Sequence, residues 1–260
     1  MEKGLEKLYR YRWYVFAILA AQYLIVYFQR VAPAVVAQEL IDDFRISGAS
    51  LGLLASAYFY PYALTQIPVG ILSDSWGPKR TLVLCGFFAS FGAIFFGLAP
   101  RFEFAFAARV FVGLGVSAVF IATMRVFAEW YRGIELARIS GAFMAIGGVG
   151  WLTATTPLAV LSQAFGWRMS FIVTGVMSAV LTVMTWLVVE DRPAKKGLPG
   201  IVEHTHKGMP AQRNIVSDLK IVLQDKYFWC IAIWFIMRGA ALFGFFGLWA
   251  GHYLMDVYQL

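Results

Sequence analysis

The strongest constraint on the fold is a series of long apolar segments separated by polar ones. Each apolar segment holds about 20 residues or more, the length that a helix needs to cross the hydrocarbon core of a bilayer. All of them must be helices, because lipid offers no partners to unpaired backbone N–H and C=O groups. We expect seven such segments, at Trp13–Val36, Ala49–Leu72, Thr81–Ala99, Glu103–Phe127, Ile139–Leu161, Met169–Val189 and Phe228–Gly251.

The composition agrees with a polytopic membrane protein. Hydrophobic residues make up 60% of the chain and charged residues 14%, whereas a typical soluble domain carries about 25% charged residues. The formal net charge of +7 needs no nucleic acid to explain it, because most basic residues fit into connections on one side of a bilayer. Cys85 and Cys230 fall inside apolar segments, so we expect small buried side chains rather than a disulfide or a metal pair. The first apolar segment is too long for a cleavable signal.

Basic residues are distributed unequally between the two sets of connections. Lys and Arg resist translocation, so the side that holds most of them is cytoplasmic. One side holds only Arg45, Arg101 and Arg168. The other holds Lys3, Lys7, Arg10, Arg12, Lys79, Arg80, Arg132, Arg138 and the basic residues between Glu190 and Lys226. We therefore expect a multi-pass protein of the plasma (inner) membrane with a cytoplasmic amino terminus.

The spacing of the apolar segments divides the chain into three parts. Residues 1–189 hold six segments with short connections, residues 190–227 form a long polar connection, and residues 228–260 begin a second group of segments. The connection is rich in Pro, Gly and Lys, which predicts a flexible cytoplasmic linker with one short surface helix near Ile215–Leu223. His204 and His206 lie in this linker, and two histidines without further ligands favour solvation over metal binding.

A dense polar turn, Gly70–Arg80, separates the second and third apolar segments. Gly77 and Pro78 predict a tight turn, and the basic residues after it predict a cytoplasmic position. The turn carries the pattern Gly-x-Leu-x-Asp-x-x-Gly-x-Lys at Gly70, Leu72, Asp74, Gly77 and Lys79. This pattern resembles the signature turn between the second and third helices of transporters of the major facilitator superfamily. The plainer alternative is an ordinary basic turn.

This resemblance implies a specific all-α membrane fold. Proteins of that superfamily have two six-helix bundles, each built from a pair of three-helix repeats. The chain matches the amino-terminal bundle, the cytoplasmic loop after it and the seventh helix. We therefore expect a fragment of a 12-helix transporter, whose partners are the lipid bilayer and a missing carboxy-terminal half. The implied activity is alternating access, in which the two halves rock around a central site.

Two further stretches resemble the same family. On the fourth segment Arg109 precedes small residues, which permit close helix approach. On the fifth segment, three glycines from Gly147 to Gly150 and then Pro157 are expected to allow close packing and bending, although the strict glycine-proline pair of the family is absent. Arg125 is placed to pair with Glu129, four residues later. The resemblance implies a conformational or gating role for Gly70, Asp74, Gly77, Lys79, Arg80, Arg109, Gly113 and Pro157.

Two arginines lie deep in predicted helices and need a specific reason, because insertion scales give roughly 2.5–3.5 kcal/mol for an arginine at the bilayer centre. Arg30 shares a helix face with Tyr23 and Tyr27, and Pro33 follows it and can bend the helix. Arg238 lies in the seventh segment. In the fold that the chain resembles, the first and seventh helices both line the central cavity. Two arginines there would bind a carboxylate or a phosphate in a fork.

The arginine pair resembles the one found in the organophosphate and organic-anion branches of the superfamily. Arg238 lies about one turn earlier than that pattern requires, so a carboxylate or a zwitterionic metabolite is as compatible as a phosphate ester. The alternative is a structural Arg30 that bonds a neighbouring helix, in a transporter of neutral solutes.

A polar stripe runs along the second segment. Tyr58, Tyr62 and Gln66 are each four residues apart, so they share a helix face, which either lines a cavity or packs between helices. No Asp or Glu lies at the middle of any segment, so this half encodes no carboxylate proton relay of the usual kind. Coupling would then reside in the missing helices, in the substrate, or in the exchange of one anion for another.

These features favour a secondary transporter, active or exchanging, for a small anionic or zwitterionic metabolite. The alternative is a membrane sensor or receptor built on the same fold. We do not expect an enzyme, because no nucleophile–base pair or metal-ligand cluster lies at depth. No cofactor and no metal ion are implied.

Overall fold

The computed structural model describes residues 2–199, 215–241 and 257, and the regular elements in these parts are all helices. The chain divides into two compact units, Met1–Glu203 and His204–Leu260. The predicted all-α architecture is confirmed. The two linker histidines and the seventh predicted segment beyond residue 241 lie outside the described residues.

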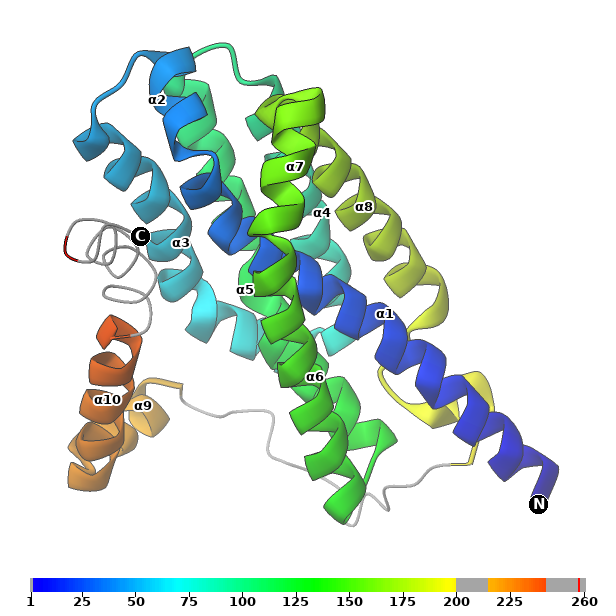
Figure 1. Ribbon diagram of the computed structural model, residues 1–260. Coiled ribbons are helices and arrows are strands. Elements are labelled where there is room, and N and C mark those ends of the chain that lie inside the picture. Colours follow the sequence, from blue (N-terminus) through cyan, green and yellow to red (C-terminus); the bar gives the residue numbers. More distant parts are fainter. Residues whose placement is uncertain (1, 200–214, 242–256, 258–260) are drawn as a thin grey trace. The chain divides into compact units, whose positions relative to one another are not determined.

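The first unit is a helical bundle with two ends (Figure 1). Figure 1 places α2 and α7 at the upper end, whereas α1 begins, and α3, α5 and α8 finish, at the lower end. We call this lower end the basic end, because it carries Lys79, Arg80, Arg138 and Lys195. The elements are α1 (Glu2–Val35), α2 (Ala37–Phe44), α3 (Gly48–Ser75), α4 (Pro78–Leu98), α5 (Phe102–Trp130), α6 (Gly133–Thr153), α7 (Thr156–Phe165), α8 (Trp167–Val188) and the short 3-10 helix η1 (Pro193–Lys196).

Five helices of the described part are long and apolar enough to cross a membrane. They cover the first, third, fourth and sixth predicted segments and the first portion of the fifth. Helix α3 covers the second predicted segment but is not among the five, because its tyrosines and Gln66 lower its hydropathy. The five spans are Glu6–Val35, Pro78–Leu98, Phe102–Trp130, Gly133–Thr153 and Trp167–Val188.

The fifth predicted segment, Ile139–Leu161, is not one continuous helix. It is divided into α6 and α7, and Pro157 explains the break. Proline has no N–H to donate to the carbonyl of Thr153, and its ring clashes with that carbonyl in a continuous helix. The N–H of Thr155 instead donates to the carbonyl oxygen of Leu152 at 3.2 Å. The prediction of one continuous helix was therefore wrong. Where a bend was expected, the helix is interrupted between Thr153 and Thr156.

Two large hydrophobic clusters fill most of the described bundle, one toward each end, and a third, small cluster consists of Val69, Cys85 and Ala118. On α1 the cluster at the basic end extends to Val26, and the opposite cluster begins at Ala32. Arg30 lies between them, and Arg109 lies in the corresponding gap on α5. The fold therefore places both arginines where its two apolar cores meet, well away from either end of the bundle.

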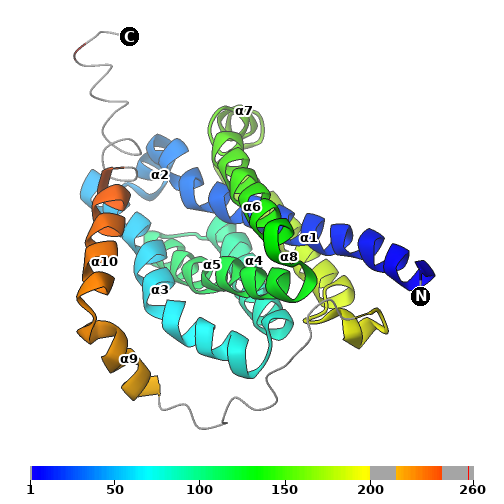
Figure 2. The ribbon, with the colours of Figure 1, turned by 90° about the horizontal axis from the view of Figure 1, so that it is seen from below.

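Helix α5 packs closely against both α3 and α4, as both views of the bundle indicate (Figure 2). A Cβ atom at Gly115 would lie 2.2 Å from the backbone nitrogen of Ala89 on α4, and one at Gly113 would lie 2.3 Å from the carbonyl oxygen of Tyr58 on α3. Neither position has space for a larger residue. The close approach expected from these small residues is confirmed.

The second unit contains two described helices, α9 (Ile215–Gln224) and α10 (Lys226–Gly239). The predicted short helix near Ile215–Leu223 is confirmed by α9. Helix α10 covers the start of the seventh predicted segment, and the side chain of Asp225 caps it by accepting a hydrogen bond from the N–H of Tyr227 at 2.9 Å. Arg238 lies in the last turn of α10, with its guanidinium 5.8 Å from the ring centre of Trp234.

Candidate functional site

Arg30 lies among tyrosines that the sequence analysis named as candidate site residues. Its Nε donates a hydrogen bond to the hydroxyl of Tyr58 at 3.3 Å. Its guanidinium carbon is 5.0 Å from the ring centres of Tyr27 and Tyr62, and 5.7 Å from that of Tyr58. Aromatic faces attract a cation at such distances through their quadrupole, most strongly where water is excluded. Residues from α1 and α3 thus hold a charged guanidinium at the boundary between the two apolar cores.

Helix α6 packs against Tyr23 and Tyr27 of α1. The hydroxyl of Tyr23 donates to that of Tyr27 at 3.3 Å, and the ring of Tyr23 stacks on Phe143 with ring centres 4.1 Å apart. A Cβ at Gly147 would lie 2.6 Å from Cε1 of Tyr23 and 2.9 Å from Cε2 of Tyr27. Glycine at this position of α6 therefore lets both rings, which meet edge to face, approach the helix closely.

The stripe on α3 divides into a buried and a half-buried part. Tyr58 is fully buried, and its ring lies parallel to that of Tyr62 with ring centres 6.2 Å apart. Tyr62 and Gln66 are half-buried and continue the same face toward the basic end. Tyr58 therefore serves helix packing as well as Arg30, whereas Tyr62 and Gln66 are the members with exposed surface from which to contact a solute.

Arg109 is buried and serves a different purpose. Only 2% of its surface is exposed, and its guanidinium lies 4.7 Å from the ring centre of Tyr58. Its Nη1 donates to the backbone carbonyl oxygen of Gln29 at 3.0 Å. In an α-helix that oxygen would accept from the N–H of residue 33, and residue 33 is a proline. Arg109 supplies the donor that Pro33 lacks, and so ties α5 to the polar centre of α1.

Two buried amides on α1 were missed by the sequence reasoning. Gln29 is 1% exposed and Gln22 is 7% exposed. Within the described residues, both side-chain polar atoms of Gln29 and the Oε1 of Gln22 have no hydrogen-bond partner. The available signal was their spacing of seven residues within an apolar run, which places both on one helix face.

The predicted pairing of Arg30 with Arg238 joins residues of different units. Arg30 belongs to the first unit and Arg238 to the second. The pair therefore stays a prediction.

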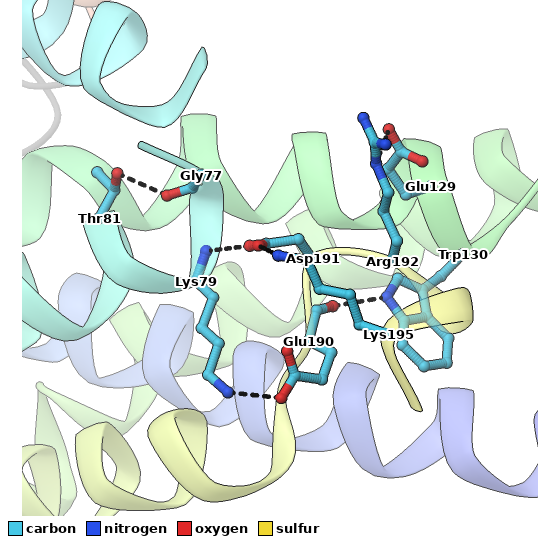
Figure 3. Close-up of polar contacts among 9 residues, drawn as sticks. All are labelled: Gly77, Lys79, Thr81, Glu129, Trp130, Glu190, Asp191, Arg192 and Lys195. Atoms are coloured by element: carbon cyan, nitrogen blue, oxygen red, sulfur yellow. Dashed lines mark hydrogen bonds and ion pairs between the residues drawn. The ribbon is translucent and has the colours of Figure 1, made fainter. Parts of the chain in front are cut away.

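A second polar cluster lies at the basic end, around the α3–α4 turn (Figure 3). Gly77 adopts φ +101°, a value that L side chains rarely reach. Helix α4 starts directly after it, and the carboxylate of Asp191 accepts a hydrogen bond from the backbone N–H of Lys79 at 2.8 Å. Asp191, which follows α8 in the chain, thereby caps the positive end of α4 from a distant part of the sequence.

Ion pairs tie this turn to the segment that follows α8. The Nζ of Lys79 lies 2.7 Å from Oε1 of Glu190, and the Nζ of Lys195 lies 2.6 Å from Oδ2 of Asp191. The indole N–H of Trp130 donates to the carbonyl oxygen of Glu190 at 2.9 Å. Figure 3 shows these contacts together. The sequence signal for this cluster was the pair Glu190 and Asp191, directly after the sixth predicted segment. The sequence analysis gave these two residues no role.

The expected pair between Arg125 and Glu129 is not the one that forms. Nη1 of Arg125 pairs with Oδ1 of Asp74 at the end of α3, and Glu129 has the Nε of Arg192 at 3.6 Å. Local helical spacing made the first pairing reasonable, but the fold brings another carboxylate to Arg125 and another guanidinium to Glu129. Asp74 thus links α3 to α5, and Gly70 lies one turn before it on α3.

The start of α1 is fastened to the α5–α6 turn. The hydroxyl of Tyr131 donates to the carbonyl oxygen of Arg12 at 2.9 Å, and Arg12 pairs with Glu135 at 2.9 Å. Burial raises the pKa of Tyr131 to about 12, although the Arg12 guanidinium acts in the opposite direction. The phenol is therefore a neutral donor at physiological pH.

No group of three or more His, Cys, Asp or Glu side chains in the described residues could hold a metal ion. Cys85 is buried in the first unit, and Cys230 is exposed in the second. The expectation of a buried residue is confirmed for Cys85 and wrong for Cys230, which lies on α10.

Comparison with known proteins gives several relatives. The chain is 28% identical over 181 residues to the probable sulfoacetate transporter SauU of Cupriavidus necator, covering 70% of this chain and 42% of that protein. It is 29% identical over 190 residues to the probable galactarate/D-glucarate transporter GudP of Bacillus subtilis, covering 71% and 42%. It is 26% identical over 264 residues to the hexuronate transporter of Escherichia coli, covering 98% and 60%. The chain thus spans about half the length of these relatives.

Solved structures agree on the fold. The chain superposes with a TM-score of 0.73 and 22% identity on a bacterial homolog of the human lysosomal transporter Spinster, in an inward-facing and unoccupied conformation. The match covers 96% of this chain and 57% of that one. The POT family transporter PepTSo gives a TM-score of 0.54 at 16% identity. The predicted helical bundle and its half-length relation to a complete transporter are both confirmed.

The family assignment rests on the sequence itself. A match to the family described as Major Facilitator Superfamily extends over residues 19–260, which is most of the chain and includes the α3–α4 turn, Arg30 and Arg109. This family consists of transporters rather than enzymes, as the sequence had indicated. The chain belongs to the Major Facilitator Superfamily.

Proposed function

We propose that the chain forms the amino-terminal half of a secondary transporter that moves small organic anions by alternating access, with Arg30 as the anion ligand. The observation that carries this proposal is the position of Arg30, a guanidinium held by tyrosines between the two apolar cores. A permanent charge is costly at such depth, and an arginine fork matches a carboxylate or sulfonate in two parallel hydrogen bonds.

The relatives support an anionic substrate. Three of them are named for sulfoacetate, for galactarate and D-glucarate, and for hexuronate, all of which are acids that are ionised at neutral pH. A polyhydroxy acid also needs hydrogen-bonding groups beside its carboxylate. In this proposal Tyr62 and Gln66 provide them from α3, Tyr23 and Tyr27 complete the site from α1, and Arg238 contributes a second cation from the seventh helix.

The gating part of the proposal assigns the basic-end cluster to the conformational change. Lys79 and Asp191 join the α3–α4 turn to the segment after α8, and the Asp74–Arg125 pair joins α3 to α5. Alternating access requires such end contacts to form in one state and to loosen in another. The other residues with a proposed conformational role are Gly70, Gly77, Arg80, Arg109, Gly113 and Pro157. The basic end is cytoplasmic in this proposal, residues 190–227 connect the two halves, and the membrane is the plasma (inner) membrane.

The test is ligand-induced stabilisation of the intact transporter in detergent. The panel contains hexuronates, aldarates, sulfoacetate and phosphate esters, with amino acids and neutral sugars of matched size. A ligand at 100 times its Kd stabilises the native state by about 2.7 kcal/mol. Acids should stabilise the wild type, Arg30→Lys should respond weakly because it keeps the charge and loses the fork, and Arg30→Gln should not respond. Arg101→Gln, an exposed arginine at the opposite end, is the matched control.

Two outcomes would reject the proposal. Equal stabilisation of the wild type and Arg30→Gln by the same acids would show that Arg30 is structural. Stabilisation by neutral sugars alone would move the substrate class to neutral solutes and direct attention to Tyr62 and Gln66.

A further inference from the structure

A cleft opens at the basic end between the start of α4 and the end of α8. Its volume is about 420 Å³, and none of its lining residues belongs to the Arg30 cluster. Three basic side chains, Lys79, Arg80 and Lys195, line it together with two tryptophans, Trp76 and Trp186. Basic groups beside tryptophan are typical of the level at which the headgroups of a bilayer lie.

The charges in the cleft do not cancel. Lys79 is paired with Glu190, and Lys195 is paired with Asp191. Three basic side chains against two carboxylates leave one positive charge. That charge belongs to Arg80, which within the described residues has no acidic partner and whose guanidinium lies 5.9 Å from the ring centre of Trp76. The cleft therefore attracts one negative charge.

The apolar surface next to the cleft is of the kind that acyl chains cover. Leu84 of α4 lines the cleft, and the exposed Phe87 and Phe91 follow it along the same helix. On α8, Trp186 lines the cleft and is 61% exposed, and an exposed apolar row leads away from it toward the opposite end of the bundle. That row is Val183, Val180, Val176 and Val173.

We propose that this cleft binds one anionic phospholipid, with the phosphate at Arg80, the glycerol region between Trp76 and Trp186, and the acyl chains along α4 and α8. Charge complementarity and the adjoining apolar face together select this occupant. A free small anion would use the single charge and gain nothing from the exposed Phe87 and valine surface. A zwitterionic lipid would satisfy the apolar face but would set its own cation beside Arg80.

The bound lipid has a structural consequence. Lys79 and Asp191 line the cleft as well as joining α4 to the segment after α8. A lipid held there would bridge the start of α4 and the end of α8 at the place where Asp191 caps α4. The anionic lipid is thus expected to stabilise the contacts of the basic end.

The experiment measures lipid binding to the intact protein by native mass spectrometry from detergent, titrated with phosphatidylglycerol and, separately, phosphatidylcholine. Phosphatidylglycerol should bind the wild type more tightly than phosphatidylcholine. Arg80→Gln should weaken phosphatidylglycerol binding about fivefold, the contribution of one basic residue near an anionic membrane surface. Arg80→Lys should retain most of it. Arg138→Gln is the matched control, because Arg138 is also exposed at the basic end but does not line the cleft.

The outcomes separate the proposal from its alternatives. Equal losses of phosphatidylglycerol binding in Arg80→Gln and Arg138→Gln would mean a diffuse attraction to basic residues. That result would overturn the proposal of a specific site in the cleft. Equal affinity of the wild type for the two lipids would overturn it too. Competition by glycerophosphoglycerol, the water-soluble headgroup, at concentrations similar to those of the lipid would show a free-phosphate site without an acyl component. Unchanged unfolding temperatures of all variants in phosphatidylcholine exclude misfolding as the cause of lost binding.

Discussion

The Nη1 atom of Arg109 lies 3.0 Å from the carbonyl oxygen of Gln29, the oxygen that the α-helical pattern would assign to the missing N–H of Pro33. A proline within a membrane helix leaves such a carbonyl without its usual donor, and lipid cannot replace it. A side chain from α5 does so here. The buried arginine and the proline of α1 are therefore two parts of one arrangement beside the proposed anion site.

This arrangement gives a prediction for stability. Arg109→Met should lower the free energy of unfolding by about 1–3 kcal/mol, because the Gln29 carbonyl is left buried without a partner. In a Pro33→Ala background the helix regains its own donor, so the same substitution should cost less. The measurement is a double-mutant cycle on unfolding of the intact protein in detergent, with a coupling energy of about 1 kcal/mol or more expected. Strict additivity of the two substitutions would contradict the linkage.

Most long helices of the first unit were predictable because their causes are local. The lengths of the apolar segments predicted these helices, and Gly77 with Pro78 predicted the turn before α4. The break between α6 and α7 was signalled by Pro157 but not predicted as a break, because prolines at Pro33, Pro61 and Pro68 remain inside their helices. Whether a membrane helix bends or stops at a proline depends on which neighbours replace the lost hydrogen bond, and those neighbours are distant in sequence.

Around Arg30, the residue types were predictable from the sequence, whereas the contacts between helices were not. The helical spacing of Tyr23, Tyr27 and Arg30 placed them on one face, and the structure brings Tyr58 and Tyr62 to the same guanidinium. The cap that Asp191 gives to α4 spans more than a hundred residues of sequence. Helical periodicity relates only residues that are close in sequence, so it could not predict this contact. The contact depends on the packing of α8 against α4.

Gly147 and Gly148 give a matched pair of substitutions on α6. Gly147→Ala should destabilise the protein by about 1–3 kcal/mol, the usual cost of overpacking. It should also weaken anion binding, because the new Cβ displaces the rings of Tyr23 and Tyr27, and Tyr27 packs against Arg30. At Gly148 a Cβ meets no heavy atom within 4 Å, so Gly148→Ala should leave binding unchanged and stability equal or slightly higher. Unfolding temperature and ligand titration of both variants provide the check, and a similar effect of the two would refute the role of Gly147.

Removal of the Asp191 carboxylate should loosen the basic end. Asp191→Ala deprives the N–H of Lys79 of its acceptor and the first turn of α4 of a favourable charge, which together should cost about 0.5–2 kcal/mol. Asp191→Asn, which keeps an acceptor, should fall between that variant and the wild type. Asp42→Ala is a suitable control, since Asp42 is an exposed residue of α2 at the opposite end. The unfolding free energies of the three variants decide the order, and an unaffected Asp191→Ala would exclude a capping role.

Tyr131 makes stability depend on alkaline pH in a known direction. Its pKa is raised by burial from an ordinary value near 10 to about 12 in the folded protein. A group whose pKa is raised on folding stabilises the native state fully below its unfolded pKa and loses that effect as pH rises through the folded value. The unfolding temperature of the wild type should therefore fall between about pH 10 and pH 12 more steeply than that of Tyr131→Phe, which has no phenol to ionise. Below pH 9 the wild type should have the higher unfolding temperature of the two, because it keeps the hydrogen bond from Tyr131 to the Arg12 carbonyl. Parallel pH profiles for the two proteins would mean that the hydroxyl is solvated in the native state.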